Sequence, residues 1–444
     1  MTSSAVAVLA HGIGGRDDLP LPLGWAVTGA AVAVVVSFVA LGVLWRTPRW
    51  GGGDGVRPLP ARLATAPDSR AAGIVAQAAG LLLGLYVLSA LAFGSDDTDN
   101  PLPWVVYVLL WVGLVPASLV LGPVWRRLDP IRAAHLLLHR ALRLDPAEGL
   151  RPLPAGLGYW PAAVGLFGFT WLELVAQDNA SRSTLRLAIG LYVAVQVLAG
   201  MVFGARWYDR GEALEVWSGL FARMSPWTRN ADGRWGWRSP LRGLDRLPAS
   251  PGLVATVMVM LGSTAYDGLS GSTWWTVRVQ ESALPSVLLR TAGLAGTIAA
   301  LWLVYVVCTT AAGRIAGTRG VRALPGAFAG SILPVALGYV VAHYYSFFVV
   351  EVQRAVIKLS DPWGRGWDVL GTGDLQPSYA LVDPSLVVVV QVLAIVAGHV
   401  LGVVVAHERA VTLFPRRAAV VGQLPLLVLM VALTCTGLFL LFAS

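Results

Sequence analysis

Three ionisable side chains interrupt apolar runs that are long enough to cross a membrane: Glu173 in WLEL, Asp267 in AYDGLSGS and His343 in AHYYSF. Carboxylates and imidazoles bind metal ions and carry protons, and within hydrocarbon they usually face a cavity, a partner or a ligand. Counted from the ends of their runs, all three fall in the outer half of the bilayer. We therefore predict that they share an outward-opening catalytic or metal-binding site. Alternatively, each acid ends a helix or pairs with an arginine such as Arg290.

Two further histidines lie in a later apolar run. His399 and His407 are eight residues apart and so lie near one face of a single helix. At a rise of about 1.5 Å per residue, His399 lies roughly 10 Å deeper than His343, which argues against both rings binding one haem iron. We predict a proton path from the outer site through His343 to His399 and His407. The alternative for His407 is an interfacial histidine beside Glu408 and Arg409.

The composition is that of a membrane protein. Of the 444 residues, 56% are hydrophobic and 13% are charged, and the mean hydropathy is +0.66. Soluble domains carry about 25% charged residues, and several runs here reach the roughly 20 apolar residues that span a bilayer. We predict an all-α, polytopic transmembrane helical bundle, with an outer N-terminal segment at 1–21 and a single transmembrane domain at 22–444.

The distribution of basic residues predicts the orientation. Loops that follow the odd-numbered spans hold 25 of the 33 basic residues, which leaves 8 on the other side. Because cytoplasmic loops are enriched in arginine and lysine, we predict a plasma-membrane protein with both termini extracytoplasmic. The net charge of +8 arises from these loops and does not indicate nucleic-acid binding. About ten spans are predicted, at 22–45, 72–94, 103–125, 156–176, 184–205, 250–267, 286–309, 326–350, 384–406 and 419–442.

Two segments on the cytoplasmic side have helical spacing of apolar and charged residues. Residues 129–144 and 211–224 are each predicted to form an amphipathic helix along the inner interface. In the first of them, Asp129 is predicted to cap the helix and Pro130 to occupy its first turn. The following segment, 225–250, is rich in Trp, Arg, Pro and Gly and is predicted to be irregular. Each amphipathic segment sits between two spans, which suggests an internal repeat that relates 103–176 to 184–267.

Familiar catalytic and cofactor motifs are missing from the sequence. It contains no GxSxG, no Walker loop, no GxGxxG and no CxxCH. The two cysteines, Cys308 and Cys435, lie in separate apolar runs and form no paired framework. Serine-hydrolase, nucleotide-driven and c-type haem functions therefore have no motif support.

Nearly the whole chain resembles a family of multi-pass membrane proteins found in actinobacteria. The resemblance rests on AHGIGGRDDLPLP, WLEL, AYDGLSGSTWW, AHYYSF, SDPWGRGWDVLGT and GHVLGVVVAH. Some members of that family carry the label fenitrothion hydrolase. The label implies a metal-dependent hydrolase with a divalent cation at the outer site, held by Glu173, Asp267 and His343 with His11 as an additional ligand. The bound cation would activate water against phosphorus.

Three functional classes follow from these observations. The first is a membrane enzyme with an outward-facing, metal-assisted hydrolytic site. The second is a proton-coupled secondary transporter, for which Pro116, Pro334 and Gly338 supply helix breaks inside spans. The third is a subunit without chemistry of its own in a larger membrane complex. The lipid bilayer is the one partner that all three classes share.

Overall fold

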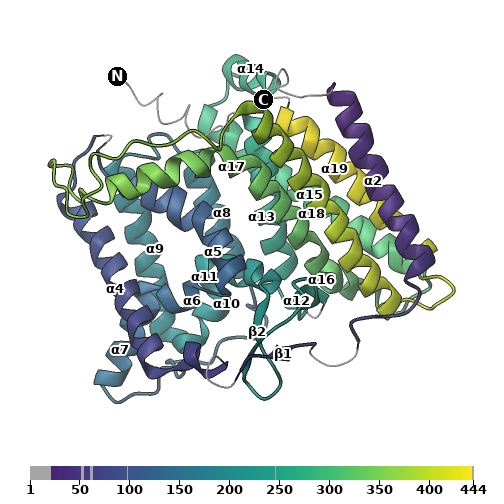
Figure 1. Ribbon diagram of the computed structural model, residues 1–444, viewed down its shortest axis with the longest axis horizontal. Coiled ribbons are helices and arrows are strands. Elements are labelled where there is room, and N and C mark those ends of the chain that lie inside the picture. The colour runs from purple at the N-terminus through teal and green to yellow at the C-terminus, as the bar shows by residue number, and fades with distance from the viewer. Residues whose placement is uncertain (1–21, 52–54, 61–63, 98, 246, 443–444) are drawn as a thin grey trace. The chain divides into compact units, whose positions relative to one another are not determined.

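A computed structural model of the chain describes residues 22–51, 55–60, 64–97, 99–245 and 247–442. This part of the chain is almost entirely helical (Figure 1). It divides into two compact units: unit 1 contains 56–240 and 348–379, and unit 2 contains the described residues before 56, then 241–347 and those from 380 onward. The single domain and the internal repeat predicted from the sequence remain predictions.

Nine helical segments of the described residues are long and apolar enough to cross a membrane. They are Leu23–Leu44, Arg70–Phe93, Trp104–Leu121, Arg182–Arg206, Leu253–Ser270, Ser286–Ile315, Val321–Lys358, Pro384–Leu413 and Val421–Phe442. Each coincides with a span expected from the hydropathy pattern, so the prediction of an all-α chain with several helices long and apolar enough to span a membrane is confirmed. The expected span at 156–176 corresponds to the 15-residue helix α8. At about 1.5 Å per residue this helix is roughly 22 Å long, which is shorter than the hydrocarbon layer of about 30 Å.

Unit 1 combines long membrane helices with several short ones. Its elements are β1 (Arg57–Pro58), η2 (Ala66–Asp68), α4 (Arg70–Phe93), the π-helix η3 (Trp104–Gly113), α5 (Leu114–Leu121), α6 (Trp125–Leu128), α7 (Pro130–Ala141), α8 (Trp160–Leu174), α9 (Arg182–Phe203), η4 (Gly204–Arg206), α10 (Tyr208–Gly211), α11 (Ala213–Phe221), η5 (Ala222–Met224), β2 (Trp227–Arg229) and β3 (Trp235–Trp237). The part of α17 after residue 347 also belongs to it.

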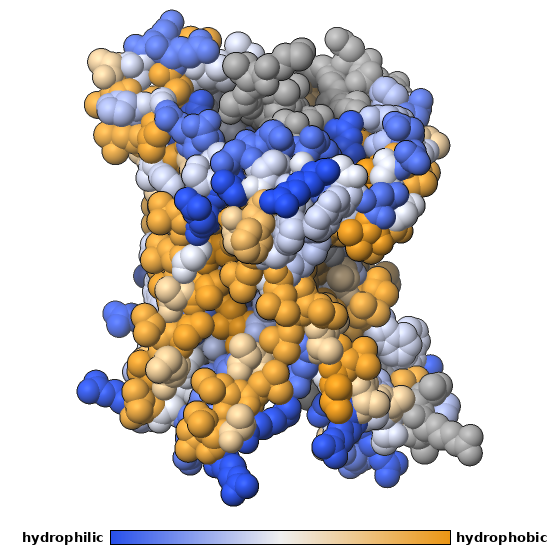
Figure 2. Space-filling model, turned by 90° about the vertical axis from the view of Figure 1, so that its left-hand side faces the viewer, coloured by the Kyte–Doolittle hydropathy of each residue, from blue (hydrophilic) through white to orange (hydrophobic). Residues whose placement is uncertain are grey.

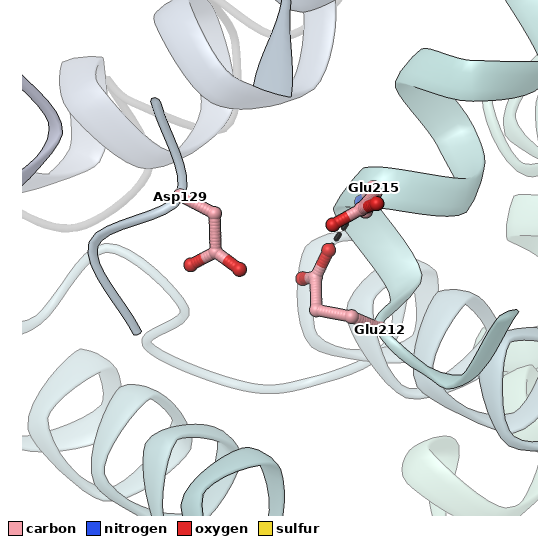
Figure 3. A group of neighbouring side chains, drawn as sticks. All are labelled: Asp129, Glu212 and Glu215. Atoms are coloured by element: carbon pink, nitrogen blue, oxygen red, sulfur yellow. Dashed lines mark hydrogen bonds between the residues drawn. The ribbon is translucent and has the colours of Figure 1, made fainter. Parts of the chain in front are cut away.

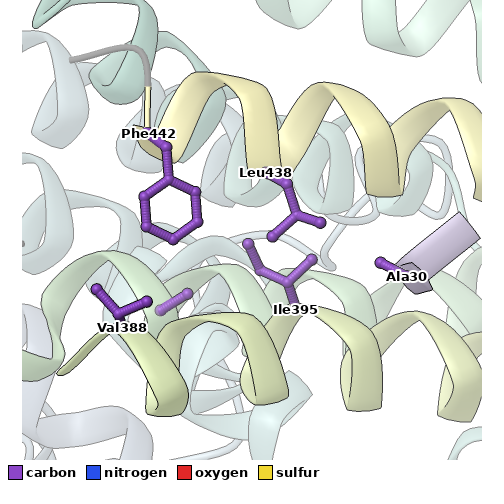
Figure 4. Close-up of a cluster of buried hydrophobic side chains, with 6 residues drawn as sticks. Ala30, Val388, Ile395, Leu438 and Phe442 are labelled. Carbon is purple, nitrogen blue, oxygen red and sulfur yellow. The ribbon is translucent and has the colours of Figure 1, made fainter. Parts of the chain in front are cut away.

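Unit 2 contains the remaining elements. They are α2 (Leu23–Leu44), α12 (Arg242–Asp245), α13 (Leu253–Ser270), α14 (Thr273–Glu281), α15 (Ser286–Ile315), η6 (Val321–Ala323), α16 (Leu324–Phe328), η7 (Ala329–Ile332), α17 (Leu333–Lys358), α18 (Pro384–Leu413), η8 (Val421–Gln423) and α19 (Leu424–Phe442). A buried apolar cluster joins α2, α17, α18 and α19 and comprises Ala30, Ala342, Val388, Ile395, Leu438 and Phe442 (Figure 4).

Glycines let the helices of unit 2 pack backbone against backbone. A Cβ atom on Gly338 of α17 would lie 2.4 Å from the carbonyl oxygen of Ala394, and one on Gly398 of α18 would lie 2.6 Å from that of Pro334. Such contacts exclude any side chain larger than hydrogen, and close approach through small residues is typical of helix packing in membranes. The α17–α18 contact therefore fixes the two helices that carry His343 and His399.

Glycines also position a corner of unit 1. A Cβ atom on Gly80 of α4 would lie 2.3 Å from the carbonyl oxygen of Leu128, and one on Gly84 would lie 2.7 Å from Pro130. The turn between α6 and α7 therefore rests directly on α4. Asp129 lies in this turn and caps α7, since its side chain accepts a hydrogen bond from the Ile131 amide.

Both amphipathic segments form helices, but α11 is not exposed on one face. Every residue of α11 except Gly219 is buried. The ring of Trp217 stacks on that of Trp111 with centroids 4.1 Å apart, and the hydroxyls of Ser118 and Ser218 lie 2.7 Å apart. Burial on all sides is unlike the position expected of an interfacial helix.

The segment after α11 is more regular than the sequence suggested. β3 pairs antiparallel with both β1 and β2, which gives a three-stranded sheet of order β1-β3-β2. Gly236 lies opposite Pro58 and Thr228, and a Cβ atom on it would meet the carbonyl oxygen of Arg57 at 2.5 Å. The prediction of irregular structure was wrong here because β3 pairs on one side with β2 and on the other with β1, which is distant in sequence.

The surface has the character of a membrane protein. One face carries a belt of hydrophobic side chains between hydrophilic margins (Figure 2). Exposed apolar residues include Leu82, Leu85 and Leu88 of α4 and Leu187, Leu191 and Leu198 of α9. An exposed apolar surface of this kind is stable in lipid and costly in water.

Candidate functional site

Asp267 and His343 form a buried pair inside unit 2. His343 Nε2 lies 2.7 Å from Asp267 Oδ2, and the hydroxyl of Tyr344 donates to the same oxygen at 3.2 Å. The side chains of Asp267 and His343 are 7% and 9% exposed, so water contributes little to their solvation. The short nitrogen–oxygen distance is that of a hydrogen bond in which a proton is shared between an imidazole and a carboxylate.

The helices that carry this pair explain its geometry. Asp267 lies in the last turn of α13, where the free backbone carbonyls make a negative charge unfavourable. Donors from His343 and Tyr344 on α17 offset that cost. The ring of His343 packs edge-on against that of Tyr344, with centroids 4.8 Å apart, which holds the imidazole in place.

Asp267 and His343 were also predicted from the sequence to bind a metal ion. Two ligand atoms of one zinc ion, each about 2 Å from the metal, are typically more than 3 Å apart. The direct contact between His343 and Asp267 is therefore that of a hydrogen bond, with no space for an ion between the two atoms. Among the residues that the structure describes, a set of three close metal-binding side chains occurs at Asp129, Glu212 and Glu215, and it does not include this pair.

Glu173 and His11 were predicted to complete the outer site. Glu173 lies near the end of α8 in unit 1, and its backbone carbonyl accepts a hydrogen bond from the Asn179 amide at 2.7 Å. His11 lies outside the described residues. Their participation in one site with Asp267 and His343 therefore remains a prediction.

The two histidines of the predicted proton path are both buried in α18. His399 is fully buried; its Nδ1 lies 2.8 Å from the Ile395 carbonyl, and its Nε2 has no hydrogen-bond partner in the described part of the chain. His407 is 1% exposed and contacts two oxygens, Gln423 Oε1 at 3.1 Å and the Trp45 carbonyl at 2.7 Å. His407 therefore ties α18 to the segment after α2 instead of lying free at an interface.

A second buried set of ionisable side chains, the acidic cluster, lies in unit 1. It consists of Asp129, Glu212 and Glu215, each of which offers an oxygen within 4.8 Å of the others (Figure 3). Their residues are 2%, 1% and 5% exposed. Glu212 caps α11: its carboxylate accepts hydrogen bonds from the amides of Leu214 and Glu215 and from the hydroxyl of Tyr192.

One buried cation neutralises part of the acidic cluster. Arg132 Nη1 lies 2.7 and 2.8 Å from the two oxygens of Glu215, and 3.0 Å from Asp209 Oδ1. Asp209 is partly exposed and also pairs with Arg126 at 3.1 Å. The fully buried part of the site thus contains three carboxylates and one guanidinium.

Burial shifts the proton affinities of this cluster. It raises the pKa of Asp129 to about 6 and that of Glu215 to about 7, although the positive charge of Arg132 opposes both increases. Burial and the neighbouring Asp129 raise the pKa of Glu212 well above its usual value. In all three, the largest cause of the raised pKa is burial, which disfavours the ionised carboxylate.

A cavity of about 340 Å³ reaches the acidic cluster. Asp129 and Arg132 form part of its wall, together with Arg126, Arg127 and Arg229. Arg127 and Arg229 both pair with Asp68 at the rim, at 3.2 and 2.6 Å. The cavity therefore borders Asp129 and Arg132, while the carboxylate oxygen Asp129 Oδ2 itself is buried.

The acidic cluster was not predicted from the sequence as a functional site. Asp129 was correctly predicted to cap a helix, and Glu212 and Glu215 were assigned to an amphipathic helix. The available signal was the spacing of acids at 209, 212 and 215 beside a strongly apolar helix, but their partners Asp129 and Arg132 are about 80 residues away.

Comparisons with known proteins give no further assignment. The chain matches no protein-family model, no curated protein and no solved structure. Function must therefore be argued from the geometry of the two buried sites.

Proposed function

We propose that the protein is a proton-coupled secondary transporter in which Asp267 and His343 bind the coupling proton. The observation that carries the proposal is the 2.7 Å contact between His343 Nε2 and Asp267 Oδ2, buried between helices that are apolar enough to cross a membrane. Ionisable residues inside membrane helices are costly, and proton relays are among their main uses.

The chemistry of the pair suits reversible proton binding. Histidine is the side chain whose usual pKa lies closest to neutrality, and a carboxylate that accepts its N–H stabilises the protonated ring. Tyr344 supplies a second donor that can remain bonded to Asp267 when the proton leaves. Binding or release of one proton thus changes the charge of the pair, while Asp267 Oδ2 keeps a hydrogen-bond donor.

The irregular helix before the pair supports a transport function. The membrane segment Val321–Lys358 consists of η6, α16, η7 and α17 in succession, so it changes helix type three times before it reaches His343. Broken helices in transporters place binding groups near the bilayer centre and allow local rearrangement. His399 is buried, and its Nε2 has no hydrogen-bond partner among the described residues, so it is the proposed next proton acceptor.

The experiment measures charge movement in proteoliposomes adsorbed on a solid-supported membrane. A sudden change in pH should give a transient current from the wild-type protein, because protons enter a site inside the membrane. Asp267→Asn and His343→Gln should reduce this current to the level of protein-free liposomes.

Tyr345→Phe is the matched control, since its hydroxyl points to the Leu381 carbonyl and not to the pair. It should retain the wild-type current. A wild-type current that persists in Asp267→Asn and His343→Gln would contradict the proposal.

A metal-assisted hydrolase is the alternative that follows from the family resemblance. It would be supported if purified protein contained a divalent metal and hydrolysed fenitrothion, and if Asp267→Asn removed both properties. That result, combined with no pH-dependent current, would replace the transporter proposal. A subunit without chemistry would show neither current nor hydrolysis.

We also propose that the protein lies in the plasma membrane with both termini extracytoplasmic. The support is the excess of basic residues in the loops predicted to be cytoplasmic. A reporter that is active only outside the cytoplasm, fused after Ser444, should be active; an inactive reporter with normal expression would reverse this orientation.

A further inference from the structure

We infer that Asp129, Glu212 and Glu215 form a binding site for a hard divalent cation in unit 1. This site is independent of the Asp267–His343 pair in unit 2 and uses neither of these residues. The ligands are all carboxylate oxygens, which select Mg²⁺, Ca²⁺ or Mn²⁺ over softer metals.

The spacing of the oxygens fits one ion. Ligand oxygens lie about 2.1 Å from Mg²⁺ and about 2.3–2.6 Å from Ca²⁺, so oxygens on opposite sides of an ion are roughly 4–5 Å apart. One oxygen from each of the three carboxylates lies within 4.8 Å of the others. The carboxylate of Asp129 points toward Glu212 and Glu215 from the facing segment (Figure 3).

One carboxylate oxygen of the cluster, Asp129 Oδ2, is buried without a hydrogen-bond donor in the part of the chain that the structure describes and could bind a cation. Asp129 Oδ1 accepts the Ile131 amide, whereas Oδ2 has no hydrogen-bond partner among the described residues, although Asp129 is only 2% exposed. A buried carboxylate oxygen without a donor is costly. A cation that bonds this oxygen would remove that cost.

When all three carboxylates are ionised, a double positive charge would balance the site. Asp129, Glu212 and Glu215 carry three negative charges when ionised, and Arg132 provides one positive charge against them. Asp209 and Arg126 neutralise each other at the edge. Arg132 does not exclude an ion from Glu215, because a carboxylate has about four lone-pair directions and Arg132 uses two.

The other charged groups near the site lie in ion pairs. Arg126, Arg127 and Arg229 line the cavity beside Asp129; Arg126 pairs with Asp209, and Arg127 and Arg229 share Asp68. His135 on α7 is buried, its Nε2 contacts the Pro146 carbonyl at 3.2 Å, and burial lowers its pKa, so it adds no charge near neutral pH.

The test is direct binding of Mn²⁺ to the full-length protein in detergent after treatment with EDTA. The electron paramagnetic resonance signal of free Mn²⁺ should fall with a stoichiometry of one ion per chain, and Mg²⁺ or Ca²⁺ should compete. Asp129→Asn should weaken binding by at least about 100-fold, beyond the roughly 10–100-fold typical of losing an outer-shell partner.

Asp129→Asn keeps the helix cap, because the asparagine oxygen can still accept the Ile131 amide. Glu351→Gln is the matched control: Glu351 is 4% exposed, belongs to unit 1, and bonds Trp104 and Arg354 outside the cluster. It should bind Mn²⁺ like the wild type, and so should Asp267→Asn.

Two outcomes would overturn the inference: no Mn²⁺ binding by the wild type, or unchanged binding by Asp129→Asn. If Asp129→Asn does not fold, Glu212→Gln replaces it, since glutamine can still accept the Leu214 amide. Thermal unfolding of the wild type gives an additional criterion: Mn²⁺ should raise the Tm, and an unchanged Tm contradicts the site. If the wild-type protein gives pH-jump currents but does not bind Mn²⁺, the result contradicts this inference and leaves the proposed transport function unchanged.

Discussion

The two buried ionisable sites differ in how their charges are balanced. In unit 2, Asp267 accepts two donors on one oxygen, and His343 can supply the single positive charge that Asp267 needs. In unit 1, three carboxylates share the single charge of Arg132, and Asp129 Oδ2 has no donor among the described residues. A buried charge is tolerated only when it is paired and hydrogen-bonded. The pair is therefore suited to exchange a proton, whereas the acidic cluster needs additional protons or a cation.

Of the changes that test this comparison, removal of Arg132 should cause the largest loss in the free energy of unfolding. Arg132→Met leaves Glu215 without a partner beside two other buried carboxylates. We expect a loss of about 3–5 kcal/mol in the free energy of unfolding, as for other broken buried ion pairs. Denaturation in mixed detergent at neutral pH measures it. The matched change of an exposed residue, Arg229→Met, should reduce the free energy of unfolding much less. Equal reductions in the two variants would contradict a deficit of positive charge at the acidic cluster.

The free energy of unfolding should depend on pH because of the acidic cluster. The folded-state pKa values of Asp129 and Glu215, about 6 and about 7, lie above the usual values of 3.8 and 4.5 for these side chains. The folded state therefore binds protons more tightly than the unfolded state, and stability falls as the pH rises through about 6–7. We expect a decrease of about 2–3 kcal/mol between about pH 5 and pH 8, from about 1.4 kcal/mol for each unit of pKa difference, discounted for coupling.

The control for this pH dependence is Asp129→Asn, in which part of the decrease should disappear. A divalent cation should also reduce the decrease at high pH, because it replaces the protons. Stability that rises with pH in the wild type would contradict the assigned direction of both pKa shifts.

A double-mutant cycle should give a smaller effect for the pair. Asp267→Ala and His343→Ala each remove one side of the hydrogen bond between these residues, while the double variant removes both sides. We expect the double variant to lose about 1–2 kcal/mol less than the sum of the single losses. Additive losses, measured by the same unfolding assay, would mean that the 2.7 Å contact contributes no coupling.

An exposed ion pair should show the smallest effect. Lys358 Nζ lies 2.5 Å from Asp99 Oδ1, but the Asp99 side chain is 61% exposed. Asp99→Asn should change the free energy of unfolding by less than about 0.5 kcal/mol, because water solvates both charges and screens their attraction. A loss comparable to that of Arg132→Met would remove burial as the explanation for the difference between the sites.

Hydropathy and charge were sufficient for the coarse fold. Nine of the expected spans coincide with helices that are long and apolar enough to cross a membrane, and Asp129 caps a helix where its position before Pro130 indicated one. These features are local, since each depends on neighbouring residues in sequence. The strands β1, β2 and β3 were not anticipated because their pairing joins residues 57–58 to 227–237.

The sequence by itself determined that the chain crosses a membrane several times and that Asp267 and His343 are unusual within apolar helices. Only the tertiary structure decided which ionisable residues meet. It joined His343 to Asp267 across 76 residues and Arg132 to Glu215 across 83. The periodicity of a helix shows which face a residue occupies, but it carries no information about the helix that packs on that face. Charge balance inside a membrane protein is set by those contacts.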